Sequence, residues 1–366
     1  MKGRGKLINF TVGPVKSPQE VIMISAQQTP YFRTDEFSEM MFENERLLQE
    51  CLNAPSKSRS AFLTSSGTGA MEACVQGLLS GKDKVGVING GTFGYRFLEL
   101  CKLHSIDCVD IRCEFGNQLT RNQLEKVKNE GLTALLVNMD ETSSGLLYDM
   151  SLISDFCREH SVFLIVDAIS SFLADALDMS LIKANAVIIS SQKALALQPG
   201  LSIVTMDECA LERVSENDVN SMYLSLKEAL KNMERGQTPF TPAVSILIQL
   251  NARLKMINKN GGVNNEIMNI KKLAYGFRER IKKYPLRMLI SEEKDRSNAV
   301  SALVTQNNNA VKICDVLKKQ YGIWICPNGG LYRDSIFRVG HIGAITEGDY
   351  EKLYEAFDEM NHHGIL

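Results

Sequence analysis

The feature that most constrains the fold is a regular alternation of short apolar runs with helical stretches. Strand-like runs occur at 62–65, 84–88, 107–111, 132–137, 162–166 and 186–190, and stretches of helical period lie at 37–52, 70–79, 95–103, 124–129 and 152–160. This alternation predicts an α/β fold in which helices cover both faces of a mostly parallel sheet. A further run at 200–205 follows too closely for a helical crossover, so we expect that strand to be antiparallel to its neighbour.

The length of 366 residues exceeds the size at which one hydrophobic core keeps growing, so we expect a large and a small domain. The chain changes character around 239–242, before a long amphipathic helix expected at 243–259. We interpret that helix as the bridge between the domains. The prediction is an extended N-terminal segment at 1–20, a large domain at 21–242 and a smaller domain at 243–366.

Composition excludes several classes of partner. The net charge of −2 and the charged content of 23% offer no electrostatic basis for binding nucleic acid or an anionic membrane. Apolar runs fall short of the ~20 residues of a membrane span, and no apolar signal segment is evident. Nine scattered cysteines without a CxxC pair indicate free thiols in a reducing compartment. We therefore expect a cytoplasmic protein that acts on a small molecule.

Lys193 and Asp167 are the strongest candidates for chemistry. Lys193 follows the apolar run AVIIS and precedes a Pro-Gly turn, and Asp167 ends the run VFLIVD. Burial disfavours the charged ammonium, and a neutral amine can form a Schiff base with an aldehyde. A fixed carboxylate suits the ring nitrogen of pyridoxal phosphate, which it keeps protonated. The alternatives are a solvated surface lysine and an aspartate that caps the next element.

A glycine loop is a candidate phosphate site. Ser66, Gly67, Thr68 and Gly69 open a helix, where backbone N–H groups and the helix dipole favour an anion. The alternative is an ordinary helix cap. The loop matches neither the GxxxxGK[ST] nor the GxGxxG pattern, which weakens a nucleotide interpretation.

Four further residues each have a functional and a structural interpretation. Phe93, between glycines, can stack on a ring or be a core aromatic. Thr142, in the turn DETSSG, can bind a phenolic oxygen or satisfy its own turn. Arg338 can bind a substrate carboxylate or form a structural salt bridge. Cys326 can be a reactive thiol, although a small buried hydrophobe is the better interpretation. The histidines, including His341, lack the spacing of a metal cluster, so no metal site is predicted.

In this order the motifs resemble the class V aminotransferases of fold type I, in the branch of alanine–glyoxylate, serine–pyruvate and 2-aminoethylphosphonate–pyruvate transaminases. The resemblance spans almost the whole chain. It rests on TVGPVKSP, SSGTGAMEA, NGGTFGYR, DETSSG, VDAISS, SSQKALALQPG, RGQTPFTP and FRVGHIG. It implies a large domain with a mostly parallel seven-stranded sheet and a smaller C-terminal α+β domain.

The resemblance also implies pyridoxal 5'-phosphate as cofactor and a role for each candidate. Lys193 would form the Schiff base and act as proton shuttle, Asp167 would pair with the ring nitrogen, and Phe93 would stack on the ring. Arg338 would bind the carboxylate of the amino or keto acid, and Thr142 would approach the phenolic oxygen. The phosphate would be held by Ser66, Gly67, Thr68 and Gln192, with Thr238 from the neighbouring subunit of a homodimer.

The predicted reaction is a ping-pong amino transfer from alanine, serine or 2-aminoethylphosphonate to pyruvate or glyoxylate. The segment ALALQPG departs from the pattern of alanine–glyoxylate enzymes and of aminoethylphosphonate enzymes, which leaves the donor open. One alternative is a cysteine desulfurase or related lyase, although that group usually has His before the lysine and this chain has Gln192. Another is a non-catalytic protein that senses a metabolite or the cofactor. A dinucleotide-binding oxidoreductase is weaker, because its glycine fingerprint is missing.

Overall fold

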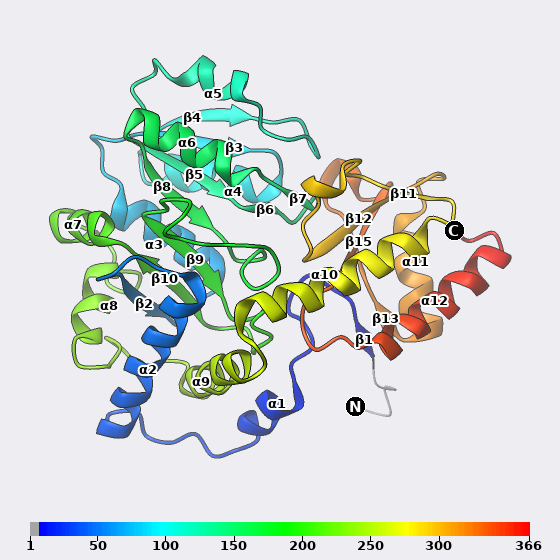
Figure 1. Ribbon diagram of the computed structural model, residues 1–366, viewed down its shortest axis with the longest axis horizontal. Helices are drawn as coiled ribbons and strands as arrows, with labels where there is room; N and C mark the ends of the chain where they lie inside the picture. The colour runs from blue at the N-terminus through cyan, green and yellow to red at the C-terminus, as the bar shows by residue number, and fades with distance from the viewer. Residues whose placement is uncertain (1–6) are drawn as a thin grey trace.

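A seven-stranded mixed sheet forms the centre of the larger part of the molecule in the computed structural model, which describes residues 7–366 (Figure 1). The strand order is β2-β10-β9-β8-β5-β3-β4. β10 is antiparallel to both β9 and β2, and the other neighbouring pairs are parallel. The strands are β2 (Arg59–Leu63), β3 (Lys84–Asn89), β4 (Asp107–Arg112), β5 (Ala134–Asn138), β8 (Phe163–Asp167), β9 (Ala186–Ser190) and β10 (Ser202–Met206). The predicted α/β fold and its antiparallel strand are confirmed.

Helices cover both faces of this sheet, which is why its inner strands are almost continuously apolar. Alternate strand residues enter different cores: Leu164 and Val166 of β8 pack on one face, Phe163 and Ile165 on the other. The helices of the first face are α2 (Asp35–Leu52), α5 (Arg121–Val127), α6 (Met150–His160) and α9 (Val244–Lys259). Those of the second are α3 (Gly67–Leu78), α4 (Thr92–Leu103), α7 (Glu208–Glu216) and α8 (Leu226–Met233).

A second, four-stranded antiparallel sheet organises the C-terminal part, with the order β11-β12-β15-β14. It has its own apolar core, to which Phe277, Phe337 and Phe357 contribute. Its strands are β11 (Leu286–Met288), β12 (Val300–Thr305), β14 (Cys326–Pro327) and β15 (Ile336–Gly340), and its helices are α10 (Gly262–Ile281), α11 (Ala310–Val316) and α12 (Glu347–His362). This arrangement agrees with the predicted smaller α+β unit.

The helix that connects the two cores lies one element later than the sequence suggests. The buried residues of α9 belong to the core of the large sheet, whereas α10 contributes Ile270 to that core and Phe277 to the C-terminal core. In Figure 1, α10 runs from the large sheet toward the C-terminal sheet. The domain boundaries themselves stay a prediction.

The start of the N-terminal segment packs on the C-terminal core, and the residues that follow contact the large part. β1 (Ile8–Asn9) pairs with β13 (Ile323–Trp324), and Phe10 lies in the C-terminal core. The predicted extended segment at 1–20 is interrupted by α1, which begins at Gln19 (α1, Gln19–Ser25), and its residues 1–6 lie outside the described part.

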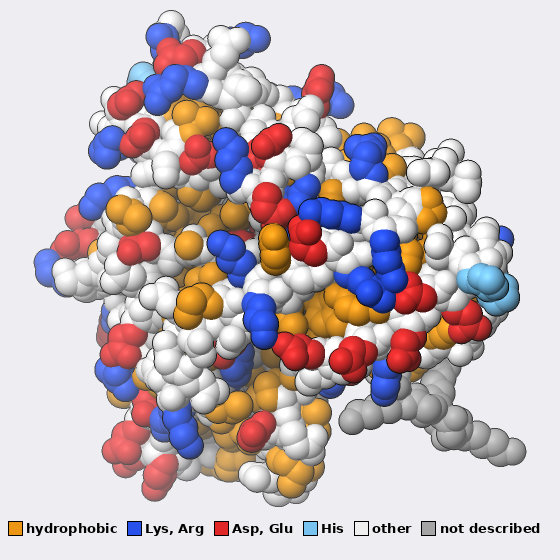
Figure 2. All heavy atoms as spheres, turned by 45° about the vertical axis from the view of Figure 1, so that its right-hand side comes forward, with side chains coloured by type: hydrophobic (Ala, Val, Ile, Leu, Met, Phe, Trp, Pro, Cys, Tyr) orange, Lys and Arg blue, Asp and Glu red, His pale blue; other side chains and the backbone are white. Residues whose placement is uncertain are grey.

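Acidic and basic side chains are interspersed over the face of the molecule shown in Figure 2. Over residues 7–366, no helix has the length and apolar character needed to cross a membrane. Within the same range, His, Cys, Asp and Glu side chains form no group of three or more suited to a metal ion. All nine cysteines are free thiols.

Candidate active site

A cavity of about 240 Å³ lies where strands of the large sheet reach their carboxyl ends, the edge at which open α/β sheets place their ligands. It collects most of the residues that the sequence singles out. Its lining includes Ser66, Gly67, Thr68, Phe93, Thr142, Asp167, Gln192 and Lys193, together with Gly13, Arg96, Asp140 and Ser170.

Lys193 lies in the short connection between β9 and β10, with its amine in a buried environment. Its Nζ donates a hydrogen bond to the carbonyl of Val12 at 2.6 Å. Burial lowers the pKa of Lys193 to about 8, so a sizeable fraction of the amine is neutral near neutral pH. Gly13 packs directly on this side chain: a Cβ there would lie 2.8 Å from Lys193 Cδ, and its φ of +135° favours glycine.

Asp167 is the last residue of β8, and its carboxyl group is buried. Oδ1 accepts the backbone N–H of Ile169 at 2.8 Å. Burial raises the pKa of Asp167 to about 7, because a carboxylate loses solvation there. A protonated ring nitrogen in the cavity would supply the cationic partner that such a buried group needs.

The N-terminus of α3 faces the same cavity. Ser66 precedes the helix without a side-chain cap, so its first turn keeps backbone donors for a ligand. Gly67 leaves no room for a side chain, since a Cβ would lie 2.4 Å from Ile169 Cδ1. The Ser190 hydroxyl donates to Gln192 Oε1 at 2.6 Å, which orients the amide of Gln192 at the rim.

Arg96 is a site residue that the sequence reasoning missed. Its Nη1 donates to Thr68 Oγ1 at 3.1 Å, and its guanidinium carbon lies 5.0 Å from the centroid of the Phe93 ring. The sequence contains a signal for this role: Arg96 follows Phe93 by three residues on one helix, so the two side chains share a face. The arginine brings a positive charge to the loop that opens α3.

Glu141, also missed, fixes the turn that carries Phe93. Its carboxylate accepts the backbone N–H groups of Phe93 at 3.2 Å and Gly94 at 3.1 Å, the first turn of α4. It also accepts the Ser143 hydroxyl and is fully buried. Glu141 therefore caps the N-terminus of α4 and brings the motifs DETSSG and NGGTFGYR together in space.

Arg338, on β15 of the C-terminal sheet, is not part of the cavity lining but contacts Thr142, which is. Its Nη1 donates to the carbonyl of Thr142 at 3.2 Å, while its Nε is buried without a hydrogen-bond partner among the described residues. Burial lowers the pKa of this guanidinium. The Thr142 hydroxyl is 2.7 Å from that of Ser170. The unsatisfied donor disfavours the structural interpretation of Arg338, because a buried guanidinium without its partner is costly.

Two candidates lie elsewhere or differ from expectation. Thr238 is outside the cavity; its hydroxyl donates to the carbonyl of Phe240 at 2.7 Å, beside Tyr223. A contact from Thr238 to a neighbouring subunit stays a prediction. Cys326 is only half-buried and pairs with Arg338 across β14 and β15, so it is less enclosed than a core thiol.

The chain is similar to known proteins over most of its length. Residues 25–330 match the family model described as aminotransferase class-V. The soluble hydrogenase 42 kDa subunit of Anabaena cylindrica is 29% identical over 94% of this chain and 90% of that protein. L-aspartate–glyoxylate aminotransferase of Paracoccus denitrificans is 24% identical over 92% of this chain and 87% of that protein. The crystal structure of alanine–glyoxylate aminotransferase from Nostoc sp. superimposes with a TM-score of 0.91 at 20% identity, covering 98% of this chain and 96% of the other.

Proposed function

The chain belongs to the aminotransferase class-V family, and from that premise we propose that it transfers an amino group from a small amino donor to pyruvate or glyoxylate with pyridoxal 5'-phosphate as cofactor. One observation carries the proposal: a half-buried lysine and a buried carboxylate line one cavity with an uncapped helix N-terminus. Glyoxylate as acceptor is supported by the names of the relatives from Paracoccus and Nostoc, whose donors differ.

The residues of the cavity fit the proposed cofactor. The first turn of α3, with Thr68, Gln192 and Arg96, offers donors and positive charge for a phosphate group. Phe93 offers an aromatic face and Asp167 a carboxylate. When bound, the cofactor supplies an aldehyde carbon for an amine and an electron-withdrawing ring for the electron pair left on the substrate.

Lys193 is proposed as both covalent anchor and proton carrier. Its amine, with a pKa of about 8, is neutral often enough to act as a nucleophile near neutral pH. Once the amine of a donor replaces it, Lys193 Nζ is free to remove the proton from the donor Cα and to return a proton later. In the structure, the free amine donates to the Val12 carbonyl at 2.6 Å.

Arg338 is proposed to orient each substrate through its carboxylate. The support is its unsatisfied Nε and its contact with Thr142, a residue of the cavity lining. The first substrate departs as a keto acid, and Arg338 then holds the carboxylate of the second keto acid in the same place. One binding geometry thus serves both halves of a ping-pong reaction.

We propose that the enzyme is a homodimer in which Thr238 of one chain contributes to the phosphate site of the other. The support is that Thr238 lies outside the cavity of its own chain, in a segment, RGQTPFTP, whose residues Arg235 and Thr241 are exposed. A cytoplasmic location stays a prediction from the sequence.

Absorbance tests the function directly. The purified protein reconstituted with pyridoxal phosphate should be yellow, lose that colour with one amino donor, and regain it with pyruvate or glyoxylate. Sulfide release from cysteine would instead favour a desulfurase. A coloured protein that no amino acid bleaches would favour a sensor, and a protein that stays colourless would refute the proposal.

A further inference from the structure

Asp140 lines the cavity but has no part in the function proposed above. It begins the short strand β6 (Asp140–Glu141), is 3% exposed, and lies two residues before Thr142, whose carbonyl Arg338 holds. Its Oδ1 is buried without a hydrogen-bond partner among the described residues. Because buried polar atoms are almost always paired, an unpaired oxygen beside a cavity calls for a ligand.

The contacts of the other carboxyl oxygen of Asp140, Oδ2, indicate whether this side chain is protonated. Asp140 Oδ2 lies 3.0 Å from Ser297 Oγ, and Asp175 Oδ2 lies 2.8 Å from the same hydroxyl. Ser297 Oγ also accepts the backbone N–H of Ala299 at 3.1 Å. A hydroxyl donates only one hydrogen, so it can satisfy only one of the two carboxyl groups. The other must itself carry a hydrogen and donate it to Ser297.

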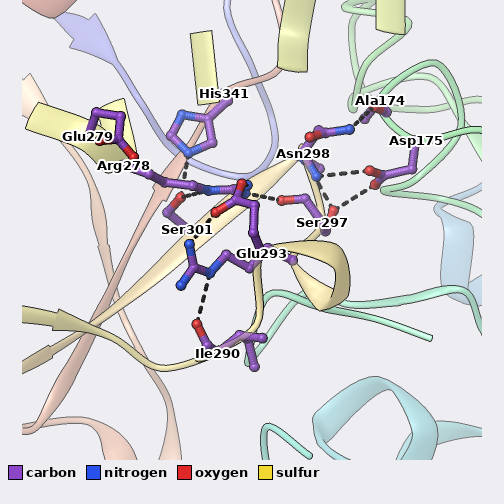
Figure 3. A network of polar contacts seen from close by, with 12 residues as sticks. Ala174, Asp175, Arg278, Glu279, Ile290, Glu293, Ser297, Asn298, Ser301 and His341 are labelled. Carbon is purple, nitrogen blue, oxygen red and sulfur yellow. Dashed lines mark hydrogen bonds and ion pairs between the residues drawn. The ribbon is translucent and has the colours of Figure 1, made fainter. Parts of the chain in front are cut away.

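Asp175 is the group better stabilised as an anion. Its Oδ1 accepts the backbone N–H of Asn298 at 2.9 Å, and the guanidinium of Arg278 donates to the carbonyl of the adjoining Ser297 (Figure 3). Burial raises the pKa of Asp140 to about 8 and that of Asp175 to about 6, so Asp140 is again the group that holds its proton more tightly. Asp140 is thus the neutral acid, with its hydrogen on Oδ2 and a bare acceptor at Oδ1.

We propose that Asp140 is a specificity-determining residue whose Oδ1 accepts a hydrogen bond from the side chain of the amino donor. The donor therefore carries a hydroxyl or amino group close to its Cα. This inference rests on the proposed function, since it requires a donor held by its carboxylate at Arg338 and its amine at Lys193. The Ser170 hydroxyl lines the same cavity and interacts with Asp140, but it is also 2.7 Å from the Thr142 hydroxyl, and its single hydrogen goes to Thr142 when Ser170 is the donor of that pair.

L-serine and L-alanine are the matched probes, because they differ by one hydroxyl group. Alanine would leave Oδ1 unsatisfied in the closed cavity. We expect kcat/KM with pyruvate or glyoxylate to favour serine by about tenfold or more. Equal values for the two donors, or a preference for alanine, would overturn the role of Asp140.

Two variants separate a neutral acid from an anion. Asp140→Asn keeps an acceptor oxygen and replaces the O–H donor to Ser297 by an N–H donor, so the serine preference should persist. Asp140→Ala removes the acceptor, so the serine-to-alanine ratio should fall toward one. Loss of the preference in Asp140→Asn, or its retention in Asp140→Ala, would contradict the proposal.

Infrared spectroscopy gives a readout that does not depend on activity or on the folding of the alanine variant. The carbonyl stretch of a protonated carboxylic acid should be present in the wild-type protein at pH 7 and missing from Asp140→Asn in the difference spectrum. The absence of such a band would rule out the neutral acid. If no donor bleaches the cofactor, the proposed function fails; if serine and alanine react equally well, only the role of Asp140 fails.

Discussion

Lys193 shows how far a single residue depends on its surroundings. The same side chain on the surface would be a charged, solvated group, whereas here burial brings its pKa to about 8. We expect Lys193→Ala to lower turnover by about a thousandfold or more, because both the nucleophile and the proton carrier are lost.

The measurement is the steady-state rate of keto-acid formation with an excess of cofactor. Lys82→Ala is the matched control, since Lys82 is an exposed lysine in a loop outside the cavity, and it should retain the wild-type rate. Near-normal turnover in Lys193→Ala would remove the basis of the proposed chemistry.

Arg338 is expected to act on binding more than on the chemical step. Arg338→Ala should raise KM for the keto acid by roughly a hundredfold, because a charge-assisted pairing is lost, while kcat changes less. Arg333→Ala, an exposed arginine in the connection before β15, serves as the control. An unchanged KM in Arg338→Ala would show that another group binds the carboxylate.

Asp140 is expected to make stability depend on pH. Its folded-state pKa of about 8 lies above the ordinary value of 3.8, so the folded state holds this proton more tightly than the unfolded chain. The stabilisation is complete below about pH 4 and is lost as the pH rises toward 8. The Asn side chain does not titrate. Between about pH 4 and pH 8, the free energy of unfolding of Asp140→Asn should therefore rise relative to that of the wild type by roughly 2 to 5 kcal/mol. Urea unfolding of both proteins at several pH values measures this difference; a constant difference would mean that the pKa is not raised.

At the scale of single residues, the sequence identifies functional residues whose type and local pattern indicate their chemistry. It misses residues whose role depends on partners far away in the chain. Asp167 ends an apolar run and Lys193 follows one, so their positions beside the core follow from the local pattern. Asp140 could not be found in this way. Its state depends on Ser297 and Asp175, which the fold brings together from separate parts of the chain.

The turn that opens α4 depends on an acceptor outside the helix. Glu141 receives the N–H groups of Phe93 and Gly94, and these would be left unpaired without it. We therefore expect Glu141→Ala to lower the free energy of unfolding by about 2–4 kcal/mol. Urea denaturation checks this, with Glu99→Ala on the exposed side of the same helix as control. Equal stability of the two variants would contradict the role of Glu141.

Secondary structure was predictable where the periodicity is strong. β9 occupies 186–190, as the apolar run predicts, and α2 extends the predicted helix by two residues at its start. The sequence predicts α9 as the bridge between the domains, whereas α10 is the helix that contributes to both cores. Both α9 and α10 are amphipathic, and only the tertiary structure decides that α9 stays in the first core while α10 reaches into the C-terminal one.

At the scale of the whole molecule, the site depends on more than one part of the chain. The large sheet and the connection after β9 supply Asp167 and Lys193, and the C-terminal sheet carries Arg338, which holds the carbonyl of Thr142 in the cavity lining. We expect a homodimer, and light scattering after gel filtration should give twice the mass of one chain. In such a dimer Thr238→Ala should weaken cofactor binding by about tenfold through the partner's phosphate site. A monomeric active enzyme would contradict this arrangement.

The pairing of β1 with β13 also has a consequence for biosynthesis. A ribosome releases Ile8 early and Ile323 near the end, so the first strand waits for its partner while the central sheet can already assemble. Until translation is nearly finished, the stretch that presents the Val12 carbonyl to Lys193 is therefore held from its C-terminal side alone, where the Val15 N–H donates to the Gln192 carbonyl. The site is therefore expected to be complete only once the last strands have been synthesised, since β15 also carries Arg338.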